Sequence, residues 1–147
     1  MLNYTIQSAG LNDGQHIVDA GCGVGGPAIH FAKHLDISIQ GLTISEKQVA
    51  AGKSKIRAQG LENKIQIQKG DYHFLDQIYE KESADAVLFL ESLGHSDRPV
   101  QVIQAAHKVI KEGGFIYIKD FFQREFINKT REIRTQKVIE NLSLIHI

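Results

Sequence analysis

His16-Ile-Val-Asp-Ala-Gly-Cys-Gly-Val-Gly-Gly-Pro27 is the stretch that decides the fold of this chain. It predicts a short apolar strand, a glycine-rich turn and a helix that begins at Pro27, because proline suits the first helical position, where an N–H would have no partner. The glycines of the turn allow a sharp bend and a close approach of the backbone to a ligand. A strand, a glycine turn and a helix N-terminus in this order are typical of a nucleotide-binding site.

Asp19 helps to decide which ligand such a turn would hold. The spacing Gly21-x-Gly23-x-x-Gly26 fits the dinucleotide fingerprint, and Gly21-x-Gly23-x-Gly25 fits the pattern of enzymes that use S-adenosylmethionine (SAM). Asp19 lies two residues before Gly21, where a carboxylate would repel a pyrophosphate. SAM has no phosphate and carries a sulfonium and an ammonium group, so the carboxylate favours SAM. A turn that only joins a strand to a helix remains the alternative.

Length and composition limit the number of domains and the kinds of partner that the chain can have. The chain has 147 residues, enough for one domain with one core. With 17 Lys and Arg against 17 Asp and Glu, the formal net charge is zero, and no basic excess points to a nucleic-acid partner. Cys22 is the single cysteine, which excludes an internal disulfide. No signal peptide is visible, and the longest apolar run, Ala86 to Leu90, is too short to cross a bilayer. We expect a cytoplasmic protein without a membrane span.

Strands and helices alternate along the chain after a polar, turn-rich lead-in over residues 1–15. Apolar patterns predict further strands over 37–42, 64–69, 84–90 and 115–119, and helices over 27–35, 45–59 and about 97–110. Val100 lies on the expected buried side of the third helix, and Gly113-Gly114 is expected to stop that helix. The alternation predicts an α/β fold, a Rossmann-like doubly wound sheet of about five parallel strands with helices on both faces.

Asp19, Thr43, Asp71 and Glu91 stand at the carboxyl ends of four successive predicted strands. In a parallel sheet these ends meet at one edge, so one pocket can collect all four side chains. A dinucleotide enzyme usually has an acidic residue where Thr43 stands, which is a point against a nicotinamide cofactor. Many SAM enzymes also use an acid at that position.

His30 and His34 lie four residues apart on the first predicted helix, so they share a face. Nothing nearby completes a metal-binding set such as HExxH. We therefore interpret the pair as part of a solvated helix face and expect no metal site.

The chain resembles the class I SAM-dependent methyltransferases from about His16 to Asp120. Val18-Asp-Ala-Gly-Cys-Gly-Val-Gly-Gly26 matches the first motif of that family, and Gly70-Asp71 matches its adenine-side motif. Gly41-Leu-Thr-Ile-Ser45 with Gln48 is similar to the subgroup that acts on sterols, tocopherols and lipid acyl chains. Glu91-Ser-Leu-Gly-His95 is similar to the loop after the fourth strand in sterol and tocopherol enzymes.

The resemblance implies a set of cofactor-binding residues. Asp19, Ala20 and the backbone of Gly21, Cys22 and Gly23 would hold the methionine part of SAM. Thr43 and Ile44 would lie against ribose and adenine, Gln48 would reach the ribose, Asp71 would accept from the adenine amino group beside the Tyr72 backbone, and Leu90 and Glu91 would line the reacting end. Ser45-x-x-Gln48 also fits a helix capping box, so both roles remain open for Gln48.

Glu91 and His95 are the candidate catalytic bases. A base is needed only when the acceptor must lose a proton, because the sulfonium already activates the methyl group. A cofactor or structural contact for Glu91, and a simple loop position for His95, are equally open. The cyclopropane-forming branch carries an acid just before its histidine. Gly94 stands there in this chain, which argues against cyclopropane formation.

Two departures from the family concern its ends. The family's sheet usually finishes with two more strands, whereas Gln123 to Asn141 looks helical, and only 15 residues precede the first strand. We therefore expect residues 1–141 to be the SAM-binding core of a longer enzyme, lacking the usual last two strands. Leu142–Ile147 matches the translation of a transposon-end sequencing adapter, and we interpret these six residues as a non-native tail.

Three functional hypotheses remain. The favoured one is methyl transfer from SAM to a small-molecule or lipid-like acceptor. The second is the Rossmann domain of an NAD(P)-dependent oxidoreductase, which Asp19 and Thr43 oppose. The third is a non-catalytic SAM-binding fragment with an incomplete acceptor pocket. Binding of S-adenosylhomocysteine or of NADH separates the second from the other two, and methyl transfer separates the first from the third.

Overall fold

A computed structural model describes residues 2–120 of the chain. These residues form one sheet in the order β3-β2-β1-β4-β5, in which all paired neighbours are parallel. The strands are β1 (His16–Ala20), β2 (Ser38–Thr43), β3 (Ile65–Lys69), β4 (Ala84–Leu90) and β5 (Ile110–Lys119). The strand order reverses between β1 and β4, where a doubly wound sheet binds its ligand. The predicted α/β, Rossmann-like sheet is confirmed. The predictions for Gln123–Asn141 and Leu142–Ile147 lie outside the described residues.

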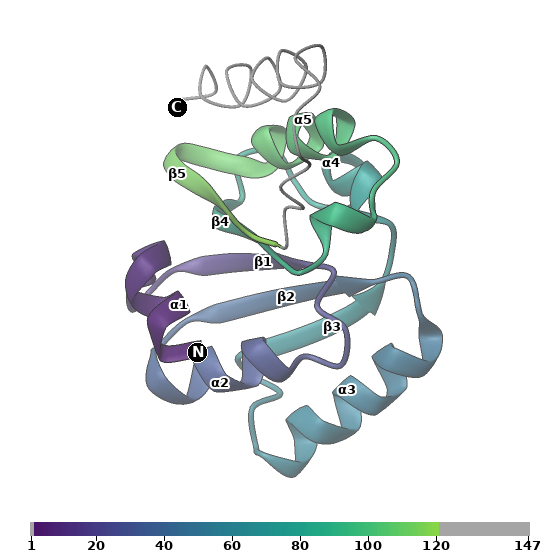
Figure 1. The fold of residues 1–147 in the computed structure, drawn as a ribbon. Helices are drawn as coiled ribbons and strands as arrows, with labels where there is room; N and C mark the ends of the chain where they lie inside the picture. Colours follow the sequence, from purple (N-terminus) through teal and green to yellow (C-terminus); the bar gives the residue numbers. More distant parts are fainter. Residues whose placement is uncertain (1, 121–147) are drawn as a thin grey trace, which may run out of the picture.

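Helices cover both faces of the sheet (Figure 1). One face carries α1 (Leu2–Ala9), α2 (Gly26–His34) and α3 (Glu46–Ala58), and the other carries α4 (Leu75–Ile78) and α5 (Pro99–Val109). Two 3-10 turns, η1 (Tyr72–Phe74) and η2 (Leu93–His95), follow β3 and β4. Alternate strand residues feed the two cores: Ile17 packs with Phe31 of α2, and Val18 packs with Val102 of α5. The predicted three-layer arrangement is therefore present.

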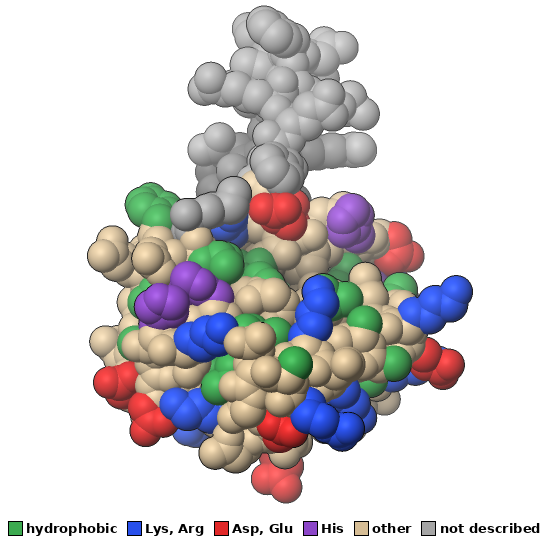
Figure 2. Space-filling model, turned by 90° about the horizontal axis from the view of Figure 1, so that it is seen from below, with side chains coloured by type: hydrophobic (Ala, Val, Ile, Leu, Met, Phe, Trp, Pro, Cys, Tyr) green, Lys and Arg blue, Asp and Glu red, His purple; other side chains and the backbone are tan. Residues whose placement is uncertain are grey.

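The layer of α2 and α3 has a mixed outer surface. Figure 2 views it from outside, and Lys and Arg side chains there lie interspersed with Asp and Glu. The inner side of α3 is formed by Gly52 and Ile56, which are buried, with half-buried Val49 beside them. This amphipathic pattern agrees with the helix predicted over 45–59.

Helix α1 corrects the prediction of a turn-rich lead-in over residues 1–15. Leu2, Ile6 and Ala9 recur at spacings of four and three, so they share one helix face. That face packs on the core cluster that includes Leu11 and Phe31. An eight-residue helix is marginal by itself in water, so packing against the domain stabilises it, and local sequence signals for it are weak.

The junction of α5 and β5 also differs from the prediction. Helix α5 ends at Val109, and β5 begins at once at Ile110 and includes Gly113 and Gly114. A Cβ on Gly114 would lie 2.7 Å from the carbonyl oxygen of Asp85. The glycine pair therefore permits a close, irregular pairing with β4 and does not stop the helix.

Val100 is 54% exposed and not part of the core, contrary to the prediction. The buried stripe of α5 is formed by Val102, Ala106 and Val109. At about 100° per residue, Val100 lies on the opposite side of the helix from this stripe.

Candidate functional site

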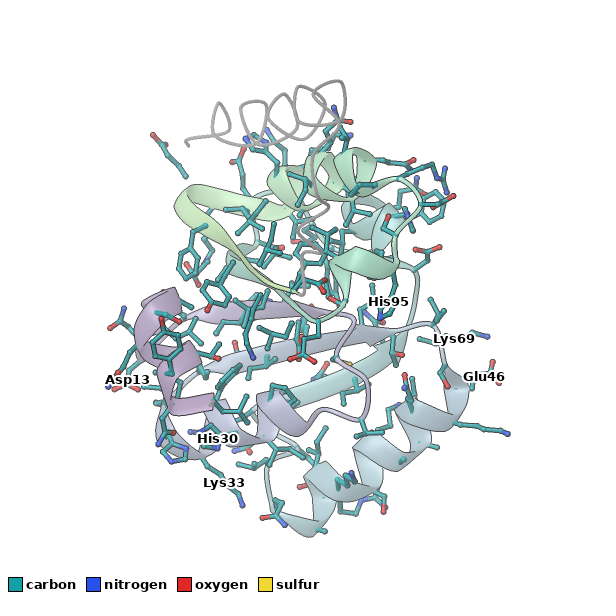
Figure 3. All side chains as sticks on the ribbon, in the orientation of Figure 1. Asp13, His30, Lys33, Glu46, Lys69 and His95 are labelled. Carbon is teal, nitrogen blue, oxygen red and sulfur yellow. The ribbon has the colours of Figure 1, made fainter. Side chains whose placement is uncertain are left out.

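The carboxyl ends of the strands gather the predicted site residues at one edge of the sheet. Asp19, Thr43 and Leu90 belong to the last two positions of β1, β2 and β4, and Asp71 follows β3 by two residues. Figure 3 shows His95 on the same side of the sheet as the Lys69–Glu46 ion pair, which lies at the end of β3 and the start of α3, while Asp13 lies at the opposite edge. The predicted clustering at one rim is therefore present in the structure.

Asp19 is buried at the end of β1, with 2% of its surface exposed. Its Oδ2 atom has no hydrogen-bond partner among the described residues. Burial raises the pKa of Asp19 to about 7. An unpartnered buried carboxylate is destabilising, so this arrangement fits a site at which a bound ligand supplies the positive charge or the donor.

Gly21 and Gly23 shape the turn in different ways. Gly21 has φ +93°, and a Cβ there would lie 2.4 Å from Cβ of Ser92. Gly23 has φ +56°, and its Cβ would meet no atom within 4 Å. Gly21 is thus required by packing across the β1–β4 boundary, whereas the position of Gly23 borders open space that a ligand can enter. Ser92 completes the junction, because its Oγ donates to the carbonyl oxygen of Ala20 at 2.6 Å.

Cys22 is buried inside the turn. The backbone N–H groups of Gly21 and Cys22 both donate to the carbonyl oxygen of Leu42 at 2.9 Å, which ties the turn to β2. Burial, and to a lesser degree the nearby Asp19, raises the pKa of the Cys22 thiol to about 12. A Cβ on Gly41 would lie 2.8 Å from the Cys22 sulfur, so the thiol fits only because β2 carries a glycine there.

Thr43 and Gln48 are joined to each other. Thr43 is 6% exposed, and its hydroxyl donates to Oε1 of Gln48 at 2.6 Å and accepts from the Ser45 N–H at 3.3 Å. Ser45 caps α3 by accepting from the Gln48 N–H, as predicted. The Gln48 side chain does not complete the capping box, and its amide remains in the exposed rim. Ile44 beside it is 72% exposed, an apolar surface suited to a flat ligand.

Asp71 begins η1 and is fixed by His73. Its Oδ1 accepts from the His73 backbone N–H at 2.9 Å and contacts the ring Nδ1 at 2.6 Å. Burial acts to raise the pKa of Asp71, but the hydrogen bonds from His73 hold that pKa below its ordinary value. Tyr72 lies between them in sequence, and its hydroxyl donates to the Ser92 carbonyl oxygen at 3.1 Å. The end of β3 is thus joined to the loop after β4.

Glu91 occupies a left-handed conformation, φ +57°, directly after half-buried Leu90. Its N–H donates to the Lys119 carbonyl oxygen at 2.6 Å, and its carboxylate lies 3.5 Å from the Lys119 ammonium. The backbone therefore turns sharply at the end of β4 and leads into η2, which carries exposed His95. The two candidate bases lie on one short loop beside the β1 turn.

A hollow of about 700 Å³ lies elsewhere, beside β2 and β3. Its lining includes Gln40, Gln66, Gln68 and Tyr79 and none of the strand-end residues Asp19, Thr43, Asp71 or Glu91. We place the candidate site at the carboxyl edge, because the unpartnered carboxylate and the glycine turn lie there.

His30 and His34 stack on α2 with ring centroids 4.2 Å apart, and His30 also contacts the Asn3 amide oxygen at 2.6 Å. Within residues 2–120, no group of three or more His, Cys, Asp or Glu is arranged to hold a metal ion. None of the helices described in that range has the length and apolar character that crossing a membrane requires.

Ser92 and His73 contact the candidate site residues and were not predicted from the sequence. Ser92 contacts residues 20 or more positions away, and nothing in its local sequence signals this. His73 lies two residues after Asp71 of the Gly70-Asp71 motif, and this short spacing could have indicated a contact between the two side chains.

Comparisons with known proteins agree with this geometry. Among curated relatives, the sterol 24-C-methyltransferase of Debaryomyces hansenii is 36% identical over 104 residues, which are 71% of this chain and 27% of that protein. The ajmaline N-methyltransferase of Rauvolfia serpentina is 31% identical over 123 residues, 84% of this chain and 42% of that protein. The chain thus spans less than half the length of either relative.

Solved structures and a family model complete the comparison. The structure of the cyclase SpnF has a TM-score of 0.79 and 29% identity, and the match covers 85% of this chain and 45% of that one. The model described as mycolic acid cyclopropane synthetase matches residues 2–141. The predicted relationship to small-molecule and lipid methyltransferases is confirmed, and the chain belongs to the mycolic acid cyclopropane synthetase family.

Proposed function

We propose that this chain is the cofactor-binding core of a SAM-dependent methyltransferase that acts on a small-molecule or lipid-like acceptor. The observation that carries the proposal is Asp19, a buried carboxylate at the strand-order reversal beside the glycine turn, whose Oδ2 has no hydrogen-bond partner within residues 2–120. A cationic ligand compensates such a group, whereas a pyrophosphate would be repelled. The named activities of the relatives, sterol C-methylation and alkaloid N-methylation, support an apolar or weakly basic acceptor.

The residues present fit SAM. The proposed binding residues are Asp19, Ala20, Gly21, Cys22, Gly23, Thr43, Ile44, Gln48, Asp71, Tyr72, Leu90 and Glu91. When bound, the cofactor would supply an activated methyl group on a sulfonium. Asp19 would hold the positively charged end, and Asp71 would accept from the adenine amino group through its outer edge. Thr43 is buried and acts through Gln48, whose amide it orients toward the rim.

The chain's own chemical task is then to orient an acceptor and exclude water. Glu91 and His95 are the proposed bases for acceptors that lose a proton during transfer. The Glu91 carboxylate lies 3.5 Å from the Lys119 ammonium, on the loop after β4.

Gly94 supports methyl transfer over cyclopropane formation, despite the name of the family. Its N–H donates to Oδ2 of Asp120 at 2.7 Å, and a Cβ there would lie 3.1 Å from Oδ1 of Asp120. An acidic side chain at this position would bring a second carboxylate against the first, where like charges repel. The loop is thus built for glycine before its histidine.

Two calorimetric titrations test the proposal. The purified chain, confirmed as folded by circular dichroism, is titrated with S-adenosylhomocysteine and, separately, with NADH. Saturable binding of the first alone is expected. A methyl-transfer assay with labelled SAM and a panel of sterols, fatty acyl chains and alkaloids then tests the reaction on the longest available form of the protein.

NADH binding without S-adenosylhomocysteine binding would replace the proposal with the oxidoreductase hypothesis. Binding of S-adenosylhomocysteine without transfer to any acceptor, by a form that includes the segments its relatives have, would favour a SAM-binding protein without methyltransferase activity. The unit over residues 1–141 is likewise a proposal, supported by the family match over 2–141.

A further inference from the structure

His73 contacts two separate segments of the candidate site. Its side chain is 11% exposed. Nδ1 lies 2.6 Å from Oδ1 of Asp71, and Nε2 lies 2.8 Å from Oγ of Ser96 and 3.3 Å from Oδ1 of Asp97. Asp71 follows β3, whereas Ser96 and Asp97 follow η2, in the loop after β4. One nearly buried ring therefore bridges the two sides of the rim.

The chemistry of the first contact fixes the role of Nδ1. An ionised carboxylate only accepts hydrogen bonds, so Nδ1 carries the hydrogen in its contact with Asp71. The backbone N–H of His73 uses the same oxygen, Oδ1. With two donors on Oδ1, the carboxylate has a fixed orientation, and its side chain is 44% exposed, so it remains accessible at the rim.

The second contact fixes the loop after β4. Ser96 Oγ contacts His73 Nε2 and also accepts from the Arg98 N–H at 3.0 Å. The adjacent Tyr72 makes a parallel link to Ser92, and its ring packs edge-on against Phe89. The segment from 92 to 97 is thus attached to η1 at both ends.

We propose that His73 is a positioning residue that sets Asp71 for the adenine amino group and, through its other nitrogen, holds the loop that carries His95. The inference rests on the proposed function, because Asp71 has an adenine to recognise only if the chain binds SAM. The two roles of His73 can be tested separately. Nδ1 acts on the recognition of adenine, and Nε2 acts on the conformational stability of the loop after β4.

Two substitutions separate these halves. The amide nitrogen of Asn can replace Nδ1, and the longer Gln side chain can replace Nε2. His73→Asn should keep the preference for S-adenosylhomocysteine over S-inosylhomocysteine, in which a carbonyl oxygen replaces the amino group. His73→Gln should reduce that preference roughly tenfold, since one of the two hydrogen bonds that orient the Asp71 carboxylate is lost while the backbone N–H of residue 73 keeps the other.

Hydrogen–deuterium exchange over residues 91–98 of the unliganded protein gives the opposite ranking. His73→Asn should increase exchange in this loop, and His73→Gln should leave it near the wild-type value. Ser96→Ala removes the nearer of the two partners of Nε2, together with the acceptor of the Arg98 N–H, and it should increase exchange at least as much as His73→Asn. His107→Asn, at an exposed position of α5, is the matched control and should change neither readout.

The outcomes distinguish the inference from the function on which it rests. Wild-type protein that binds neither nucleoside would overturn the proposed function and the inference together. Wild-type binding with unchanged preference and exchange in the folded variants would overturn the inference alone. Equal loss of both properties in His73→Asn and His73→Gln would show a merely structural side chain and would also overturn it.

Discussion

Asp19 and Asp85 are two aspartates on adjacent central strands, and they lie near opposite edges of the sheet. Asp85, near the amino end of β4, accepts from the His16 N–H at 2.7 Å and pairs with Lys111 at 2.9 Å. Burial acts to raise the pKa of Asp85, but these partners hold it below its ordinary value. Oδ2 of Asp19 has no such partner in the described part of the chain, and burial raises the pKa of Asp19 to about 7.

Asp85 is thus a carboxylate that stabilises the fold, whereas Asp19 is the carboxylate that we propose binds a ligand. Both side chains belong to the same sheet, so the difference lies in the partners that the sequence provides. A fold that leaves one carboxylate unpaired at its ligand edge loses stability there, and a bound cation can recover that loss. Substitutions at the two positions should therefore change the stability of the unliganded chain in opposite directions.

Asp19→Asn should give the largest effect. At pH 8 it removes a buried charge, so the unliganded chain should gain stability on the order of 4 kcal/mol, an upper value from the shift of the pKa to about 7. It should also weaken S-adenosylhomocysteine binding roughly 30-fold or more. Urea unfolding and calorimetry measure the two effects. A less stable variant with unchanged affinity would show that Asp19, like Asp85, only stabilises the fold.

The pH dependence of SAM affinity tests whether the ionised form of Asp19 binds the ligand. Below pH about 7 the folded Asp19 is protonated, so binding of a cation must release a proton. Affinity should fall roughly 20-fold between pH 7.5 and 5.5. Calorimetry in buffers of different ionisation enthalpy measures the released proton; no release at pH 6 would contradict the assignment.

Stability of the unliganded chain should show the reverse trend. The folded chain holds the Asp19 proton up to pH about 7, whereas the unfolded chain releases it near 3.8. The folded state therefore binds more protons between these values, and the Asp19 contribution to stability falls as pH rises through this window. The Asn variant lacks this slope and is the control.

Asp85→Asn should act in the opposite direction on stability and leave the ligand site intact. Loss of the Lys111 pair and a weaker bond to His16 should destabilise the fold by about 1–2 kcal/mol. Since the pKa of Asp85 is lowered in the fold, its contribution is present at neutral pH and is lost as pH falls through the acidic range. S-adenosylhomocysteine affinity should stay within about twofold of wild type; a larger loss would mean that the two edges are coupled.

The smallest expected change in stability comes from two residues with a left-handed backbone, one on each side of β4. Glu82 precedes β4 and Glu91 follows it, and both have a left-handed φ, +53° and +57°. Glycine at either position should relieve strain worth roughly 1 kcal/mol. Thermal unfolding should show the gain for both, and ligand affinity should change only for Glu91→Gly. An equal loss of affinity in Glu82→Gly would remove Glu91 from the site.

The sequence predicted the sheet and the rim because both depend on local patterns. Short apolar runs and alternating apolar residues located the strands, and Asp19, Thr43 and Asp71 were placed by the rule that parallel strands end at one edge. Helix α1 was missed because its stability comes from packing on Phe31 and its neighbours.

Contacts between distant segments could not be predicted. His73 meets Ser96 across 23 residues, and Ser92 meets Ala20 across 72. The side of α5 that faces the sheet also depends on its tertiary packing, which is why Val100 was misplaced. Composition and spacing carry no information on such pairings.

The buried thiol of Cys22 has a practical consequence. Only the thiolate reacts with alkylating reagents, and a pKa of about 12 leaves almost none of it at neutral pH. The chain has a single cysteine, so its labelling rate reports one place alone. Modification must wait until the glycine turn opens and exposes the sulfur. The rate of labelling therefore measures how often the glycine turn opens. Any molecule that binds and closes the turn will slow the labelling.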